Sequence, residues 1–335
     1  MNNIPFLIKN IIIHSLQNDS EESMLSNDII EINLGIRNFI EKCVDELFED
    51  PLLKEIESEN EVLKNFENVI NERSFIYESR KFAEILQNII VQNPNIPSGH
   101  LICLYGNIGD DETIVFLKAG FKKGFDSKVL IKESVGQVIV VEEKKCLLPS
   151  SVSQIDEAVI FNVSKKQLLI KAKKYLIDGK RISYLEECIF ENKPVLSSKE
   201  KVNIIEKTRK EIVKKHFNGD LEKSAVAKQA VVDSVVNNGV IDVSEVVENS
   251  FKENPNIQKI YKEKLEERGV IEKEIEVPIK IEKKLFKKQK MVTDNDIEIY
   301  VPLNYINSPE IIEFKVGENG KLNIILKGIE DVKEK

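Results

Sequence analysis

The alternation of apolar and polar positions divides the chain into segments with strand periodicity and segments with helix periodicity. Residues 6–16 are apolar and β-branched, which predicts a strand. Residues 34–48 carry apolar side chains at helical spacing, with Asn33 placed to cap a helix and Pro51 placed to end it. Two further helical stretches are predicted within residues 59–92. The chain therefore opens with a strand followed by helices.

Strand patterns dominate the next hundred residues. Residues 100–121 predict two strands around a glycine-rich turn. Further strands are predicted at 127–132, 136–142, 157–163 and 167–171, with another indicated at 181–190. The connections are too short for crossover helices, so we expect an antiparallel meander, one face of which the preceding helices cover.

The pattern changes again near Pro194. Four helical stretches are predicted within residues 197–268, the first of which opens with a serine cap and an acidic residue in its first turn. Strands are then predicted at 270–282, 296–301, 310–316 and 321–327, with Glu318-Asn319-Gly320 as the turn of a closing hairpin.

These patterns and the chain length predict an α+β protein of two domains. The 335 residues exceed the roughly 250–300 at which a single core stops growing. We expect residues 1–195 to form a helix-covered antiparallel sheet. We expect residues 196–335 to form a helical block followed by a small terminal antiparallel sheet.

Composition favours a cytoplasmic protein without membrane contact. No run approaches the roughly 18 apolar residues that span a bilayer. The first residues lack the basic flank and the small-residue cleavage site of a signal peptide. The four cysteines lie more than 40 positions apart and form no metal-binding pair, so we expect free thiols.

Motifs for the common catalytic mechanisms are missing, so we expect a protein that is not an enzyme and holds no cofactor. The sequence has no phosphate-binding loop, dinucleotide fingerprint, nucleophile elbow, zinc-protease motif or kinase signature. His14, His100 and His216 are isolated, which favours structural or surface roles and no metal site. Asp110-Asp111-Glu112 is either a solvated hairpin tip or, as an alternative, the Mg²⁺ site of a metal-dependent nuclease.

Charge is distributed unevenly along the chain. The net charge is −8, but residues 1–100 alone carry −10. Residues 165–216 carry +8 and residues 280–290 carry +5. Lysines concentrated on one surface bind the phosphates of a nucleic acid, and the preference for lysine over arginine favours backbone contact over base reading. The predicted DNA-binding residues are Lys207, Lys210, Lys214, Lys283, Lys284, Lys287, Lys288 and Lys290.

Three segments carry a family resemblance. They are Ile13-His14-Ser15-Leu16, the strand pair at 100–118, and a closing hairpin with Gly320, Leu322, Ile324 and Lys327-Gly328. In this order, with helices between them, they resemble the bacterial nucleoid-associated protein family of the YejK type. The resemblance covers nearly the whole chain, although residues 124–195 are not matched. It implies a protein of the cytoplasm and nucleoid, with DNA bound directly or through DNA-processing proteins, and it supplies no catalytic residues.

The sequence therefore predicts a nucleoid-associated protein that binds double-stranded DNA largely through the backbone, with weak sequence preference. In the alternative, the acidic helices at 34–90 dock a basic protein partner or imitate the charge of DNA. A homodimer is also expected, because symmetric pairs are the commonest oligomers.

Overall fold

The computed structural model describes residues 5–19, 24–132, 136–149, 151–278, 281, 288–292, 295–302, 305, 308, 310–316 and 322–329. The chain divides into two compact units, Met1–Val195 and Leu196–Lys335. Each unit has its own hydrophobic core, so each is treated separately below.

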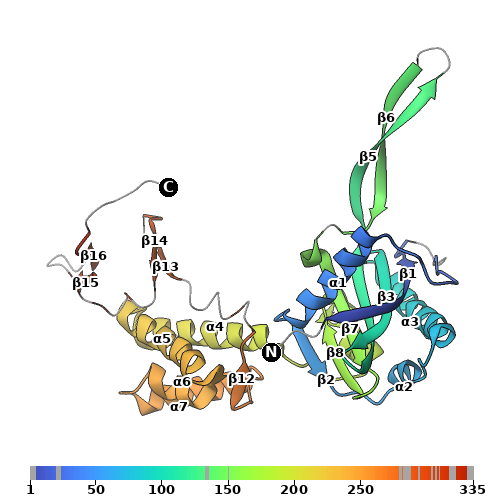
Figure 1. The fold of residues 1–335 in the computed structure, drawn as a ribbon. Coiled ribbons are helices and arrows are strands. Elements are labelled where there is room, and N and C mark those ends of the chain that lie inside the picture. The colour runs from blue at the N-terminus through green and yellow to red at the C-terminus, as the bar shows by residue number, and fades with distance from the viewer. Residues whose placement is uncertain are drawn as a thin grey trace. The chain divides into compact units, whose positions relative to one another are not determined.

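The first unit is built on a six-stranded antiparallel sheet (Figure 1). The strand order is β1-β3-β4-β7-β8-β2. Their bounds are Phe6–Leu16 (β1), Leu53–Ile56 (β2), Gly99–Ile108 (β3), Asp111–Gly120 (β4), Ile155–Asn162 (β7) and Gln167–Lys171 (β8). The strands predicted at 6–16, 100–121, 157–163 and 167–171 are confirmed, and β2 is a short edge strand that the pattern did not indicate.

Both faces of this sheet are covered by helices, whereas we expected helices on one face. On β3, Leu101, Cys103 and Tyr105 join one core cluster, while Ile102 and Leu104 join the other. The first cluster includes side chains of α2 (Glu61–Glu67) and α3 (Glu72–Gln92), and the second includes those of α1 (Leu34–Phe48). Successive strand residues point to opposite faces, so a sheet buried on both faces needs continuous apolar strands.

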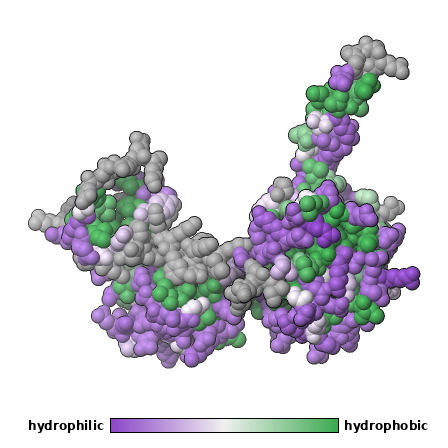
Figure 2. All heavy atoms as spheres, viewed as in Figure 1, coloured by the Kyte–Doolittle hydropathy of each residue, from purple (hydrophilic) through white to green (hydrophobic). Residues whose placement is uncertain are grey.

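Two of the expected meander strands do not join the sheet. β5 (Lys122–Lys132) and β6 (Gly136–Leu147) pair only with each other, and β7 takes the place beside β4. They form a two-stranded ribbon that projects from the body of the first unit (Figure 1). Hydrophobic side chains lie on the outer half of this ribbon (Figure 2). The prediction of one continuous meander was therefore wrong at this point.

Short elements complete the first unit. A 3-10 turn, η1 (Val152–Gln154), leads into β7, and β9 (Tyr175–Ile177) pairs with β10 (Lys180–Ile182). A π-helix, η2 (Leu185–Ile189), occupies half of the segment predicted as a strand at 181–190, so that prediction was wrong beyond residue 182.

The second unit is a helical block with short antiparallel pairs. Its helices are α4 (Ser198–His216), α5 (Leu221–Asn238), α6 (Val243–Ser250) and α7 (Pro255–Glu267). β11 (Val240–Asp242) pairs with β12 (Glu274–Glu276), and two hairpins follow, β13 (Lys288–Val292) with β14 (Glu298–Pro302) and β15 (Ile312–Val316) with β16 (Leu322–Leu326). The expected small terminal sheet is thus a pair of separate hairpins. The turn predicted at 318–320 lies outside the described residues.

Gly239 ends α5 because it adopts the left-handed conformation, with φ of 72°, and donates its N–H to the Val235 carbonyl. In the described parts of the chain, no helix has the length and apolar character needed to cross a membrane.

Candidate nucleic-acid interface

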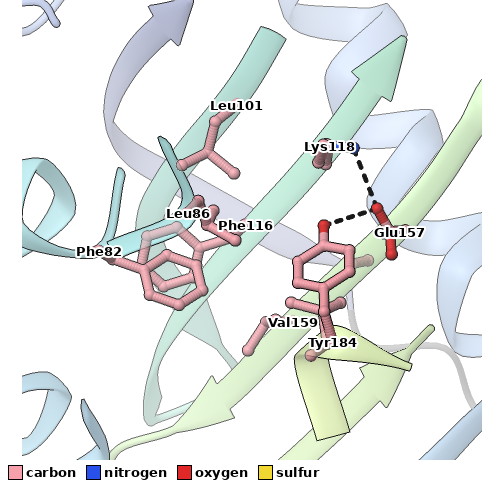
Figure 3. Close-up of a pocket in the computed structure, with 10 residues that line it drawn as sticks. Phe82, Leu86, Leu101, Phe116, Lys118, Glu157, Val159 and Tyr184 are labelled. Carbon is pink, nitrogen blue, oxygen red and sulfur yellow. Dashed lines mark hydrogen bonds and ion pairs between the residues drawn. The ribbon is translucent and has the colours of Figure 1, made fainter. Parts of the chain in front are cut away.

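The first unit buries an ion pair beside a small pocket (Figure 3). Lys118 of β4 places its Nζ 3.1 Å from Oε2 of Glu157 on β7, and both side chains are at most 4% exposed. The hydroxyls of Tyr184 and Tyr175 donate to the same Glu157 oxygen, at 2.7 and 3.3 Å. Sequence reasoning missed this cluster, because each residue occupies an ordinary strand position and the two are 39 positions apart.

The contacts of this cluster join separate segments of the first unit. Burial and the neighbouring carboxylate of Glu157 raise the pKa of Tyr184 far above its ordinary value, so its hydroxyl stays protonated and donates. The pocket is otherwise lined by apolar side chains such as Phe82, Leu86 and Phe116. The Lys118 ammonium and both tyrosine hydroxyls contact the same Glu157 oxygen, Oε2. These contacts connect β4, β7 and the segment 175–184.

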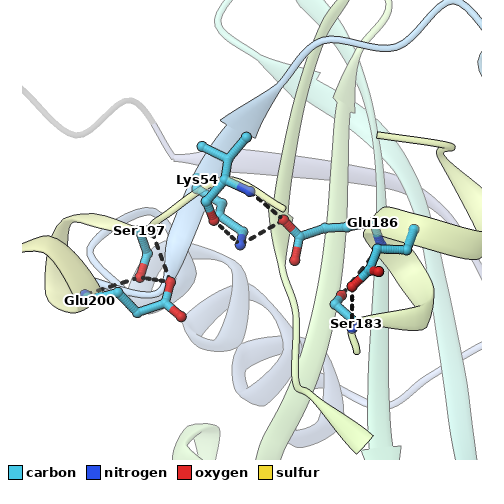
Figure 4. Close-up of polar contacts among 7 residues, drawn as sticks. Lys54, Ser183, Glu186, Ser197 and Glu200 are labelled. Carbon is cyan, nitrogen blue, oxygen red and sulfur yellow. Dashed lines mark hydrogen bonds and ion pairs between the residues drawn. The ribbon is translucent and has the colours of Figure 1, made fainter. Parts of the chain in front are cut away.

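A second buried ion pair secures the end of the first unit (Figure 4). Lys54 Nζ lies 2.7 Å from Glu186 Oε1 and donates to the Val195 carbonyl at 2.5 Å. The Val195 N–H donates to the same Glu186 oxygen at 3.1 Å. These contacts hold the last residue of the first unit against β2 and η2.

The side chains of the Asp110-Asp111-Glu112 turn are paired with their neighbours where the structure describes their contacts. Lys165 Nζ lies 2.6 Å from the Asp111 carboxylate, and Tyr105 donates to Glu112 at 2.7 Å. His14 is fully buried. Over the described ranges no group of three or more His, Cys, Asp or Glu side chains is arranged to hold a metal ion.

Helix α4 of the second unit begins at a reciprocal cap (Figure 4). The Ser197 hydroxyl accepts from the Glu200 N–H at 3.3 Å, and the Glu200 carboxylate accepts from the Ser197 N–H at 2.9 Å. The cap fixes where the helix starts and hence which residues share a face.

The inner side of α4 is anchored in the core of the second unit. Arg209 is 2% exposed and donates to the carbonyl and hydroxyl oxygens of Ser224 on α5, at 2.8 and 3.1 Å. Tyr261 of α7 donates to the Ile205 carbonyl at 3.1 Å. These contacts set the rotation of α4, so its opposite side faces outward.

The outward side of α4 is basic. We call it the lysine face, and its members are Lys199, Asn203, Lys207, Lys210 and Lys214. All five are exposed. At 3.6 residues per turn they fall within an arc of about 80°, and they extend over roughly 22 Å of helix. Lys207, Lys210 and Lys214 were predicted, whereas Lys199 and Asn203 were missed. A helical wheel started at the Ser197 cap would have found them.

The carboxylates nearest this face are committed elsewhere. Glu206 accepts two hydrogen bonds from Arg209, at 3.3 and 2.9 Å. Glu211 accepts from Arg268 at 2.7 Å, and that hydrogen bond holds its pKa below the ordinary value. Among the described residues, no carboxylate forms an ion pair with a lysine of this face. Glu211 is still close enough for Lys207 to lower its pKa further, so its carboxylate offsets part of the positive charge at Lys207.

Lys228 on α5 is half-buried and interacts with the charged groups of α4. The pKa of Lys228 lies below its ordinary value, mainly because of burial. Repulsion from Arg209 and Lys210 lowers it further, while Glu206 acts in the opposite direction.

The second predicted lysine cluster is only partly described. Lys283, Lys284 and Lys287 lie outside the described residues. Lys288 and Lys290 lie on β13, where their backbones pair with Pro302 and Tyr300 of β14. Their assignment to DNA binding stays a prediction.

Together these features define the class: an α+β protein with a structural buried ion pair in one unit and an exposed lysine face on the other. The family model described as nucleoid-associated protein YejK matches residues 12–333. The chain therefore belongs to this family of nucleoid-associated proteins, which confirms the resemblance and extends it through residues 124–195. A comparison with curated proteins found no match.

Proposed function

We propose that the protein binds double-stranded DNA directly, with the lysine face of α4 against the phosphate backbone. The observation that carries this proposal is the set of four exposed lysines on one helix face, whose neighbouring carboxylates are paired with Arg209 and Arg268. Membership of a nucleoid-associated family supports a role at DNA in the cell.

The lysine composition of the face favours contact with phosphates and weak sequence preference. A lysine ammonium acts as a point charge, whereas reading guanine requires the fork of an arginine. Each neutralised phosphate releases counterions and adds about 0.9 to the slope of log affinity against log salt. Four lysines in contact with phosphates would contribute a slope of roughly 3 to 4.

The negative net charge of the chain is compatible with this contact. The excess of acidic residues lies in residues 1–100, within the first unit, while the lysine face belongs to the second. The charges that act most strongly on a bound phosphate are those within about a Debye length of it, about 10 Å at 0.1 M salt, and these include the lysines of the face.

The lysines at 283–290 would make a second contact with the phosphate backbone of the DNA. Their number over eight residues makes them the densest basic run in the chain. The double variant Lys287→Glu/Lys288→Glu tests them separately from α4, and unchanged affinity would remove this run from the proposal.

The test of the lysine face uses the purified full chain and a labelled duplex, with affinity measured by fluorescence anisotropy over a range of salt concentrations. Lys207→Gln/Lys210→Gln/Lys214→Gln should weaken binding at least tenfold and lower the salt slope by about 3. The matched control is Lys252→Gln/Lys259→Gln/Lys262→Gln, which removes the same charge from exposed positions elsewhere in the second unit.

Equal losses in the two triple variants would show a nonspecific charge effect and contradict the assignment. The purified wild-type chain must also bind the duplex by itself. If it binds only when a DNA-processing protein is added, the association with DNA is indirect and the direct contact is wrong.

A further inference from the structure

The ribbon formed by β5 and β6, here called the arm, has one predominantly apolar face. The register places Val129 opposite Ile139, Ile131 opposite Gln137, Ser127 opposite Val141 and Phe125 opposite Glu143, and directly opposed residues share a face. The apolar members of this face, here called the apolar stripe, are Phe125, Val129, Ile131, Ile139 and Val141.

The apolar stripe is exposed to an extent that is unusual for its chemistry. Its five side chains are between 61% and 81% exposed. The arm extends about 35 Å, at roughly 3.4 Å per residue, and carries hydrophobic surface away from the body of the unit (Figure 2). A two-stranded ribbon alone is marginal in water, so this face requires a cover.

Near the base of the arm, the opposite face carries a cluster of charged side chains. The Glu142 carboxylate lies 2.9 Å from Lys128 Nζ and 3.0 Å from Lys144 Nζ. These hydrogen bonds hold the pKa of Glu142 below its ordinary value, so the cluster remains charged. Nearer the tip, Leu130 lies opposite Val138 on this face. The two faces therefore differ in charge at the base, and the five most exposed apolar side chains among the described residues of the arm all lie in the apolar stripe.

We propose that the apolar stripe packs against the same stripe of a second copy of this chain, which makes the protein a homodimer joined arm to arm. Two copies related by a two-fold axis across the ribbon would stack Phe125 of one copy over Ile131 of the other. The Val129 and Ile139 rows then meet near the axis. Such a contact is isologous, because the same surface serves both copies.

The charge and the area of the stripe both fit a second copy. Glu143 lies on the same face as the stripe, opposite Phe125, and pairs with Lys145 at 3.9 Å, so two stripes meet without a net like-charge repulsion. The five side chains offer on the order of 600 Å² per copy, or about 1,200 Å² for two, which reaches the lower bound of stable interfaces.

The first test is the mass of the full chain in solution, measured by light scattering after nuclease treatment. The wild type should show twice the 38.4 kDa of one chain. Ile131→Lys/Ile139→Lys should give the mass of a single chain, whereas Lys128→Thr/Lys144→Thr, on the opposite face, should leave the dimer intact. Helical and strand content by circular dichroism should be the same in all three proteins, because none of these side chains lies in a core.

The second test locates the contact. In a background with the exposed cysteines replaced, Cys146→Ser/Cys188→Ser, a Val129→Cys chain should be joined to its partner by a short bismaleimide reagent. A Lys128→Cys chain should react at least tenfold less. A monomeric wild type, a dimer that persists in Ile131→Lys/Ile139→Lys, or equal cross-linking at residues 128 and 129 would each overturn the proposal. A monomer would assign the stripe to a different partner.

Discussion

Lys118 and Glu157 form an ion pair of 3.1 Å on adjacent strands of the sheet, with both side chains withdrawn from water. A buried pair of this kind is destabilising when one charge is removed, because the other is left without compensation. Its two tyrosine donors make the carboxylate the centre of the cluster.

Replacement of Glu157 by glutamine should therefore lower the free energy of unfolding by about 3 kcal/mol or more. Lys118→Met should have a similar effect. The double variant Lys118→Met/Glu157→Gln should be more stable than either single variant, because it removes both charges and keeps an oxygen for the tyrosines. Urea unfolding followed by circular dichroism measures all three. If the loss of unfolding free energy in the double variant equals the sum of the two single losses, the charges of Lys118 and Glu157 are not coupled.

His14 predicts a dependence of stability on pH. The Ser26 N–H donates to Nδ1 of His14 at 3.2 Å, which places the ring proton on Nε2, 3.3 Å from the Ser79 hydroxyl. Burial, with a contribution from Arg80, lowers the pKa of His14 to about 4 in the folded chain. In the unfolded chain His14 therefore binds a proton as the pH falls through about 6.5, whereas in the folded chain it stays neutral until the pH approaches 4. The stabilisation is present above pH 6.5 and is lost as the pH falls towards 4.

His14→Gln removes this titration and serves as the reference. The stability advantage of the wild type over His14→Gln should shrink by about 2 kcal/mol between pH 7 and pH 5, at about 1.4 kcal/mol per unit of pKa shift. Urea unfolding at both pH values checks it. An advantage that stays constant would mean that His14 titrates near its ordinary pKa.

Arg209 and Lys210 are neighbours on α4 with opposite roles. Arg209→Met should cost about 2 to 3 kcal/mol, because it removes the bonds to Ser224 and leaves Glu206 without its partner. Lys210→Met should change stability by no more than about 0.5 kcal/mol, because the side chain is exposed. Thermal unfolding separates the two, and duplex affinity of the folded proteins should fall for Lys210→Met. Similar stability losses in both would contradict the orientation of α4.

The cap of α4 is testable at one hydroxyl. Ser197→Ala removes the acceptor for the Glu200 N–H and should cost about 1 kcal/mol. Ser198→Ala is the matched control, because Ser198 is the first residue of the helix and not its cap. Thermal unfolding of both variants tests this prediction. Equal unfolding midpoints for the two variants would mean that Ser197 is not the cap of α4.

Elements with strong end signals were predictable from sequence. The helix at 34–48 and the strand at 6–16 were located to the residue, because Asn33, Pro51 and a β-branched run act through neighbours in the chain. The lysine spacing on α4 was predictable for the same reason. Lys199 shares this face and lies about two turns closer to the Ser197 cap.

Pairing and coverage were not predictable in this way. The pattern of β5 and β6 resembles that of the strands in the sheet, but an alternating pattern states only that a strand has two faces. It does not state which strand lies beside it or what covers each face. The helices on both faces of the sheet were missed for that reason.

Local order in the chain thus determined the class of the protein, most helix and strand positions and the basic character of α4, because these depend on side chains a few residues apart. The tertiary structure alone decided that Lys118 meets Glu157, that β5 and β6 leave the sheet, and that Glu211 pairs with Arg268. Each of these outcomes depends on the free energy of packing between distant segments, which no local pattern contains.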